Sequence, residues 1–125
     1  MSLRNLLTAA TAGWFALAGA ALADPILVMV EQAGCAYCAM WNEKIAPIYP
    51  KTPEGKFAPL VRADLRADPP EGVTYARRVN YTPTFILVDD GKELARIEGY
   101  PGEDFFWGLL GMMLEAHTEF RKEAS

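Results

Sequence analysis

The chain contains two cysteines, Cys35 and Cys38, and only two residues separate them. The pair follows an apolar run of strand length at residues 26–30, rich in β-branched side chains, which is typical of a strand buried on both faces. After a short turn, no proline or glycine interrupts residues 35–46, so we predict a helix that ends at Pro47. The first cysteine is therefore expected where a buried strand passes into the N-terminus of a helix.

The short spacing of the cysteines bears on their chemistry. A structural disulfide stabilises a protein mainly by closing a loop in the unfolded chain, and a bridge across two residues constrains that chain very little. A reactive dithiol explains the pair better. A closed zinc site needs four Cys or His ligands, and the chain adds only His117. Two thiolates can hold copper(I), with Met29 and Met40 close in sequence, so a copper-binding module is an alternative.

Residues 1–23 have the features of a targeting segment. Arg4 carries the only charged side chain, an uncharged stretch rich in Leu and Ala follows, and residues 21–23 place small side chains at the positions that a signal peptidase requires. The pattern predicts a secretory signal peptide cleaved after Ala23, with residues 24–125 forming one domain. An uncleaved membrane anchor is the alternative, because the stretch is nearly long enough to span a bilayer. In both cases the domain leaves the cytoplasm.

The composition excludes two other classes of protein. Of the 125 residues, 51% are hydrophobic and 22% are charged, which is typical of a globular domain rather than a disordered chain. The formal net charge is −4, and the densest basic spot is the pair Arg77 and Arg78. Because nucleic-acid binding needs a larger basic patch, we expect no nucleic-acid partner.

The rest of the chain alternates between strand and helix patterns. Residues 49–58 are mostly polar and contain two prolines and a glycine, which predicts a surface loop. Residues 59–65 and 84–88 have the composition of strands, and a short helix is expected between them at residues 71–79.

A hairpin and a helix complete the predicted order, βαβαββα. The Asp-Asp-Gly turn at residues 89–91 predicts a hairpin that leads into a fourth strand at residues 94–98. Residues 103–121 follow as a helix, opened by two acidic residues that suit its positive dipole end. Its buried face is expected to carry Phe105, Leu109, Met112, Met113 and Ala116.

This order, with C-x-x-C at the first strand–helix junction, resembles the thioredoxin superfamily. Residues 81–84, Tyr-Thr-Pro-Thr, stand just before the third predicted strand, where that family places a cis-proline facing the dithiol. The resemblance covers nearly the whole chain after Ala23. It implies an α/β fold with a central mixed four-stranded sheet flanked by helices, in the minimal, glutaredoxin-sized form, because only two residues lie between Ala23 and the first strand.

Three segments extend the likeness to the SoxS-type periplasmic thioredoxins of bacterial sulfur-oxidation clusters. They are residues 31–35, 46–52 and 98–104. The resemblance implies a monomeric periplasmic reductant that acts on disulfides of a partner protein and takes electrons from a membrane donor. A dithiol oxidant, an isomerase or a cytochrome-maturation thioredoxin are alternatives, because direction depends on the reduction potential.

The expected chemistry resides in the cysteine pair. Helix N–H groups and the helix dipole stabilise a thiolate on Cys35, which is expected to attack a substrate disulfide, and Cys38 then resolves the mixed disulfide. No metal and no cofactor beyond the redox-active Cys35–Cys38 disulfide is expected. The resemblance implies that a cis bond before Pro83 presents the Thr82 backbone to an extended partner segment, and that Tyr37 matches the tyrosine of the glutaredoxin C-P-Y-C motif.

Several neighbouring residues leave open questions. Thioredoxins carry a buried aspartate six residues before the first cysteine, where this chain has Met29, and Glu31 either takes over its proton-transfer role or is a solvated charge. Trp41 either joins Tyr37 and Tyr81 in an aromatic rim around the dithiol or packs in the core. Residues 101–104 are expected to cap the last helix rather than to bind an anion. We assign no chemical role to the single histidine, His117.

Overall fold

The computed structural model describes residues 24–122, and the predicted signal peptide lies outside the described residues. At the centre is a four-stranded sheet with the strand order β2-β1-β3-β4. The strands are β1 (Ile26–Glu31), β2 (Leu60–Asp64), β3 (Thr84–Asp89) and β4 (Lys92–Glu98). β1 runs parallel to β2 and antiparallel to β3, and β3 is antiparallel to β4. The predicted mixed sheet is confirmed.

The two central strands, β1 and β3, are buried on both faces. Successive side chains of a strand point to opposite sides, so Leu27 and Met29 reach one core while Val28 and Val30 reach a second core. β3 divides its side chains in the same way. This two-sided burial is the reason that the first strand is a continuous apolar run.

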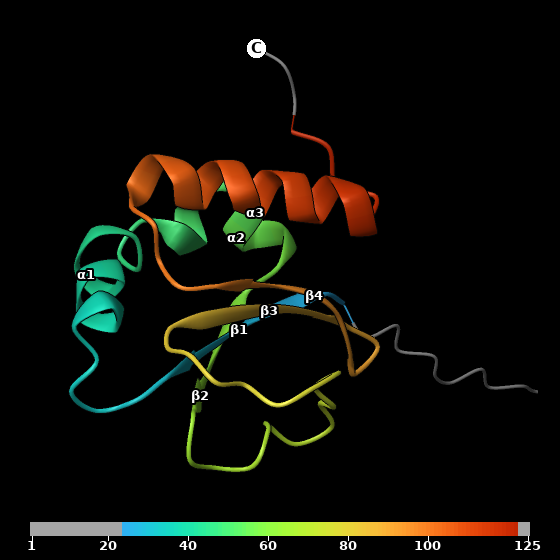
Figure 1. The fold of residues 1–125 in the computed structure, drawn as a ribbon. Helices are drawn as coiled ribbons and strands as arrows, with labels where there is room; N and C mark the ends of the chain where they lie inside the picture. Colours follow the sequence, from blue (N-terminus) through green and yellow to red (C-terminus); the bar gives the residue numbers. More distant parts are fainter. Residues whose placement is uncertain (1–23, 123–125) are drawn as a thin grey trace, which may run out of the picture.

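All helices of residues 24–122 pack on one face of the sheet (Figure 1). They are α1 (Ala36–Lys44), the 3-10 helix η1 (Tyr49–Lys51), α2 (Pro53–Phe57) and α3 (Glu103–His117). Trp41 lies at the centre of this core, with its ring centroid 5.2 Å from that of Phe85 and 5.7 Å from that of Phe106. The core therefore holds α1 and α3 against the same two central strands.

The prediction of a surface loop at residues 49–58 is wrong. The segment forms η1 and α2, because its prolines stand at helix starts, where a missing N–H breaks no intrahelical bond. Thr52 caps α2 by accepting a hydrogen bond from the Gly55 N–H at 3.0 Å. Gly55 is required, since a Cβ there would lie 1.8 Å from the Tyr49 carbonyl oxygen. Tyr49 is buried, and its hydroxyl donates to the Ala58 carbonyl.

The short helix predicted at residues 71–79 is not formed. Gly72 takes a positive φ of 81°, which a right-handed helix does not allow, and Thr74 forms an isolated parallel bridge with Lys92. Val79 is buried against the sheet face that carries no helix. An irregular segment between β2 and β3 therefore covers that face in place of a helix (Figure 1).

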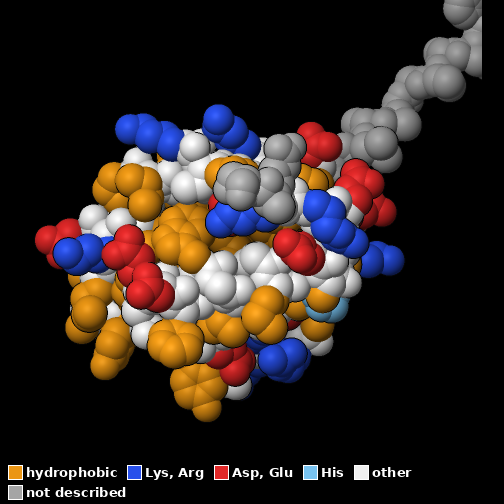
Figure 2. Space-filling view, turned by 90° about the horizontal axis from the view of Figure 1, so that it is seen from above, with side chains coloured by type: hydrophobic (Ala, Val, Ile, Leu, Met, Phe, Trp, Pro, Cys, Tyr) orange, Lys and Arg blue, Asp and Glu red, His pale blue; other side chains and the backbone are white. Residues whose placement is uncertain are grey.

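The buried face of α3 is rotated by about one residue from the predicted one. Its buried residues are Phe106, Leu110, Met113 and Leu114. Of the predicted set only Met113 belongs to the core; Phe105 and Met112 are each 69% exposed, Leu109 is 39% exposed, and Ala116 is also exposed. The helix carries two apolar stripes, so its sequence pattern alone does not select one. Seen from the α3 side, exposed hydrophobic side chains gather toward the left, where α1 lies in Figure 1 (Figure 2).

The last helix also ends earlier than predicted, at His117 rather than near residue 121. The Thr118 hydroxyl donates to the Leu114 carbonyl, and the chain then turns so that Phe120 is buried against Phe57. The extended C-terminal residues thus add to the core instead of lengthening the helix.

Candidate active site

Cys35 and Cys38 form a disulfide at the start of α1, with their Cα atoms 5.2 Å apart. Cys35 is the N-cap residue, with an extended backbone, and its sulfur accepts a hydrogen bond from the Cys38 N–H at 3.1 Å. The Cys35 side chain is half-buried, whereas Cys38 is only 3% exposed. The predicted strand–helix junction is confirmed, and it places one sulfur at the surface and the other beneath it.

The start of α1 favours negative charge on the Cys35 sulfur. The first N–H groups of a helix have no intrahelical acceptor and carry the positive end of the helix dipole. The first turn of α1 contains no acidic residue, and Lys44 lies in its last turn. A thiolate at this N-cap would accept the Cys38 N–H as a charge-assisted hydrogen bond.

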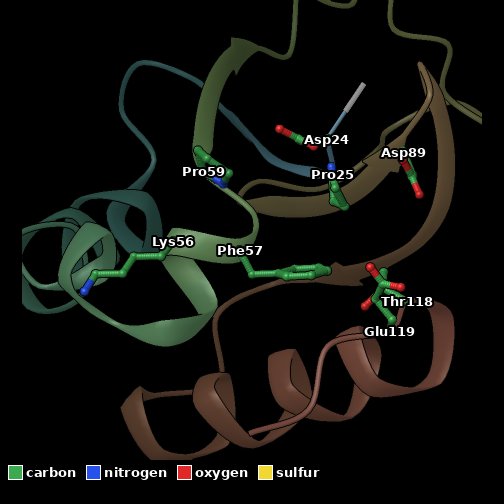
Figure 3. A pocket seen from close by; sticks show the side chains of 8 residues that line it. All are labelled: Asp24, Pro25, Lys56, Phe57, Pro59, Asp89, Thr118 and Glu119. Atoms are coloured by element: carbon green, nitrogen blue, oxygen red, sulfur yellow. The ribbon is translucent and has the colours of Figure 1, made fainter. Parts of the chain in front are cut away.

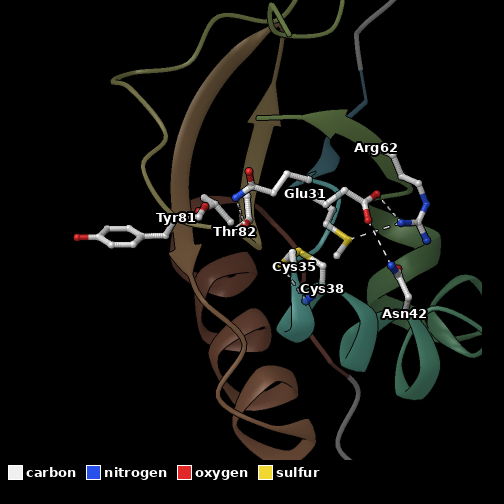
Figure 4. Close-up of a disulfide and its surroundings, with 10 residues drawn as sticks. Glu31, Cys35, Cys38, Asn42, Arg62, Tyr81 and Thr82 are labelled. Carbon is white, nitrogen blue, oxygen red and sulfur yellow. Dashed lines mark hydrogen bonds and ion pairs between the residues drawn. A yellow bond between two sulfur atoms is a disulfide. The ribbon is translucent and has the colours of Figure 1, made fainter. Parts of the chain in front are cut away.

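The loop before β3 lies beside the disulfide (Figure 4). The peptide bond between Thr82 and Pro83 is cis. Gln32, in the turn that leads to Cys35, donates a hydrogen bond from Nε2 to the Thr82 hydroxyl at 2.9 Å. Pro83 is buried, and its carbonyl accepts a hydrogen bond from the Gly99 N–H at 2.7 Å. The loop is thus fixed against both the cysteine turn and the end of β4.

A groove joins this loop to the start of α1. Tyr37 and Thr82, two of the three predicted substrate-binding residues, both line it, whereas Pro83 is buried and does not line it. The other lining residues are Met40, Glu98, Gly99, Tyr100, Pro101 and Gly102. The sequence did not predict Tyr100 as a site residue, and it named Met40 only as a possible copper(I) ligand. Met40 lies one helical turn after Tyr37 and therefore shares its face of α1.

Glu31 lies on the other side of the disulfide, at the end of β1 (Figure 4). It shares a hollow with Cys35 and Cys38. Its carboxylate accepts a hydrogen bond from Asn42 Nδ2 at 3.2 Å and pairs with Arg62 Nη1 at 2.7 Å. With 23% of its side chain exposed, Glu31 is neither a freely solvated charge nor a buried acid.

Sequence comparison agrees with the geometry of this site. A family model for a thioredoxin-like domain matches residues 19–113. This chain belongs to the thioredoxin-like family. With its C-x-x-C pair on this fold, it is a thiol–disulfide oxidoreductase, and thioredoxin-like proteins act on protein disulfides.

Solved structures show the same relationship. The periplasmic thioredoxin SoxS from Paracoccus pantotrophus, in its reduced form, is 49% identical with a TM-score of 0.72; the match covers 74% of this chain and 97% of SoxS. Fasciola hepatica thioredoxin is 21% identical with a TM-score of 0.54, covering 78% and 84%. A mutant thioredoxin from Halobacterium salinarum is 22% identical with a TM-score of 0.54, covering 80% of each chain. At that identity, the last two show the fold alone. No curated protein sequence matches significantly.

The aromatic residues of this thioredoxin-like domain divide between site and core. Trp41 is fully buried, so the core alternative is correct for it. Tyr37 and Tyr81 are 58% and 60% exposed, but the Tyr81 ring points away from the disulfide (Figure 4). An aromatic rim of three rings is therefore not formed. His117 is exposed at the end of α3.

The position of the usual thioredoxin aspartate holds a core side chain in this family member. Met29 is fully buried, and its sulfur lies 3.8 Å from Arg62 Nη1. The same guanidinium pairs with Glu31. The charged groups beside the disulfide, Glu31 and Arg62, therefore lie at the end of β1. They do not lie beneath the disulfide at the position of Met29.

Other regions of the thioredoxin-like domain lie apart from the disulfide. A hollow at the opposite end of β1 is lined by Asp24, Pro25, Lys56, Phe57, Pro59, Asp89, Thr118 and Glu119, and includes neither cysteine (Figure 3). Within residues 24–122, no three His, Cys, Asp or Glu side chains cluster as metal ligands would. In the same part of the chain, no helix has the length and apolar character needed to cross a membrane.

Proposed function

We propose that the chain is a periplasmic protein disulfide reductase in which Cys35 attacks the partner and Cys38 resolves the mixed disulfide. The observation that carries this proposal is the difference between the two sulfurs: Cys35 caps a helix at the surface, and Cys38 is 3% exposed. An attacking thiolate needs both access and stabilisation, and only Cys35 has them. The 49% identical SoxS is a periplasmic thioredoxin, which supports the location.

The reaction transfers two electrons to the partner. The Cys35 thiolate attacks one partner sulfur, a new intermolecular S–S bond forms, and the other partner sulfur leaves as a thiolate. Cys38 then loses its proton and attacks the Cys35 sulfur, which releases the second partner thiolate and forms the Cys35–Cys38 disulfide. A second dithiol must reduce this disulfide after each turnover, and for an exported protein we propose that a membrane donor supplies it. The cysteine pair needs no further cofactor.

The groove beside Cys35 is where we propose that the partner binds. An extended partner segment that contains the disulfide can lie along Thr82, with its backbone pairing to the loop in the manner of strand addition. Tyr37 and Tyr100 line the same groove and would contact the side chains on either side of the partner cysteine. Pro83 is buried, and the hydrogen bond that its carbonyl accepts from Gly99 anchors the loop.

A trapping experiment tests the proposal. In a Cys38→Ser variant the resolving thiol is missing, so mixed disulfides with natural partners should accumulate on Cys35 and be identified by mass spectrometry. The matched control is the double variant Cys35→Ser, Cys38→Ser, which should trap nothing. If the single variant traps no exported protein, the proposed function is wrong. Stoichiometric copper(I) binding by the reduced protein without disulfide reduction would favour the copper-binding module instead.

Export is tested by the N-terminal residue of the mature protein. Expression of the full chain in a bacterium with a periplasm should yield a periplasmic form that begins at Asp24. Recovery of the intact chain from the membrane fraction would instead support the uncleaved anchor.

A further inference from the structure

A buried ion pair lies on the sheet face that carries no helix. Arg96 of β4 is paired across the sheet with Ile86, and Glu93 is paired with Val88. Ile86 and Val88 both belong to the core on that face. The two charged side chains are only 3% and 2% exposed. They meet in a bidentate contact, with Arg96 Nε and Nη2 donating to the two carboxylate oxygens at 2.7 and 2.8 Å.

The contact depends on an irregularity in β4. Residues three apart in a regular strand point to opposite faces, because the side-chain period is two. The register between β3 and β4 shifts between Leu87 and Val88, so that Leu94 is an extra residue on β4. Such a bulge returns Glu93 and Arg96 to the same face. The local geometry of the hairpin therefore brings the two charges together.

The remaining hydrogen-bonding capacity of the pair is directed at one short backbone segment. Arg96 donates from Nη2 to the Arg77 carbonyl at 2.8 Å and from Nη1 to the Arg78 carbonyl at 3.1 Å. Glu93 accepts a hydrogen bond from the Ala76 N–H at 2.7 Å. Three consecutive residues are thus bound by side chains where a helix would have satisfied their backbone groups internally.

This segment leads directly into the loop that faces the disulfide. Val79, the next residue, is buried, and three residues later the chain reaches Thr82. At its far end the loop is closed by the Thr84 hydroxyl, which donates to the Tyr81 carbonyl at 2.6 Å. The bound segment at residues 76–78 and the start of β3 therefore fix the loop from both sides.

We infer that Glu93 and Arg96 are positioning residues for partner binding: they hold residues 76–78 so that Thr82 is presented beside Cys35. The inference rests on the proposed reduction of a partner disulfide. Stability alone does not explain the pair, because an apolar pair of similar volume usually stabilises a core at least as well as a buried ion pair. An apolar pair could not bind the two carbonyls and the N–H of residues 76–78.

The test separates the position of the loop from the stability of the domain. Arg96→Lys keeps the positive charge facing Glu93 but lacks the fork that bonds two carbonyls and a carboxylate together. With insulin as the protein disulfide, we expect the variant to raise KM by about fivefold with little change in kcat. Its reaction with the small disulfide DTNB, which needs only an accessible Cys35, should be unchanged. Leu114→Ala, in the other core, is the matched control and should leave KM unchanged despite lower stability.

A second measurement does not depend on the partner reaction. By amide hydrogen exchange, Glu93→Gln should lose protection at Ala76, and the NMR signals of Thr82 should shift. Unchanged exchange and unchanged Thr82 signals in both Glu93→Gln and Arg96→Lys would overturn the inference. So would equal KM changes in Arg96→Lys and Leu114→Ala. Loop changes in the variants together with a Cys38→Ser protein that traps no exported partner would contradict only the proposed function.

Discussion

At the scale of single residues, the two cysteines have the same side chain and differ only in where they stand relative to the start of α1. Cys35 stands before the first helical residue, where it is half-buried and its sulfur accepts the N–H of Cys38. Cys38 lies one turn later and packs into the core with Trp41. The order of attack and resolution follows from this difference in access and in electrostatic environment.

Alkylation of the reduced protein measures the difference directly. With limiting iodoacetamide near neutral pH, we expect the first carboxamidomethyl group on Cys35, because its sulfur is accessible and its thiolate is stabilised. Peptide mapping by mass spectrometry locates the group. First modification at Cys38 would reverse the assigned roles.

Glu31 places a negative charge in the hollow that both cysteines line. A nearby carboxylate disfavours a thiolate, and neutralising it should favour one. Glu31→Gln is therefore expected to shift the pH profile of Cys35 alkylation to lower pH. Glu119→Gln, at an exposed position in the hollow at the opposite end of β1, is a matched neutralisation and should leave the profile unchanged. A profile that does not move in Glu31→Gln would show that Arg62 already cancels the charge.

At the scale of elements, α3 shows how the contact with the core selects one of two apolar stripes. Leu110 is fully buried and its neighbour Leu109 is 39% exposed. We expect Leu110→Ala to lower the free energy of unfolding by about 2–5 kcal/mol. Leu109→Ala should change it by about 0.5 kcal/mol or less. Chemical denaturation of the two variants measures both values, and equal losses would contradict the observed face.

The elements that were predicted correctly are those whose signal is local. The apolar run of β1, the hairpin turn at residues 89–91 and the proline-free α1 each depend on contiguous residues. The prediction for residues 49–58 was wrong although its signals are local, because prolines are compatible with the first position of a helix as well as with a loop. The prediction for residues 71–79 was wrong because the deciding contacts are distant in sequence. Glu93 and Arg96, for instance, satisfy the backbone of residues 76–78 in place of a helix.

The residues of the candidate site also divide into those with a local sequence signal and those placed by distant contacts. Cys35, Cys38 and Pro83 belong to short motifs, and the structure brings them to one end of the sheet. Gln32 and Tyr100 were not predicted. Gln32 acts through a side-chain hydrogen bond to Thr82, and Tyr100 lines the same groove as Thr82. Such contacts across the fold have no spacing rule in the sequence.

At the scale of the whole molecule, the buried ion pair gives stability a dependence on pH. Burial alone would raise the pKa of Glu93, but hydrogen bonds from Arg96 and from the Ala76 N–H outweigh it and hold the pKa below its ordinary value of 4.5. A carboxylate with a lowered folded-state pKa stabilises the fold above its unfolded pKa. That contribution is lost as the pH falls through the folded-state value.

We therefore expect the wild-type protein to lose stability as the pH falls below about 4.5, and Glu93→Gln to lose less over the same range. At neutral pH the variant should be the less stable of the two, because Arg96 loses the carboxylate that accepts hydrogen bonds from its Nε and Nη2, and only the longer ion pair with Glu98, at 3.8 Å, remains. Thermal melting curves recorded from neutral to acidic pH measure both effects. Parallel curves for the two proteins would show that other carboxylates dominate acid unfolding.

The direction of β1 has a practical meaning for anything attached at the beginning of the domain. The described chain begins at Asp24, beside the hollow at one end of this strand, and the disulfide follows its other end. A six-residue strand separates the two by about 20 Å. An affinity tag, an immobilising linker or a retained leader at Asp24 thus joins the domain on the side away from the reactive sulfur, so tethered protein can be used to capture partners.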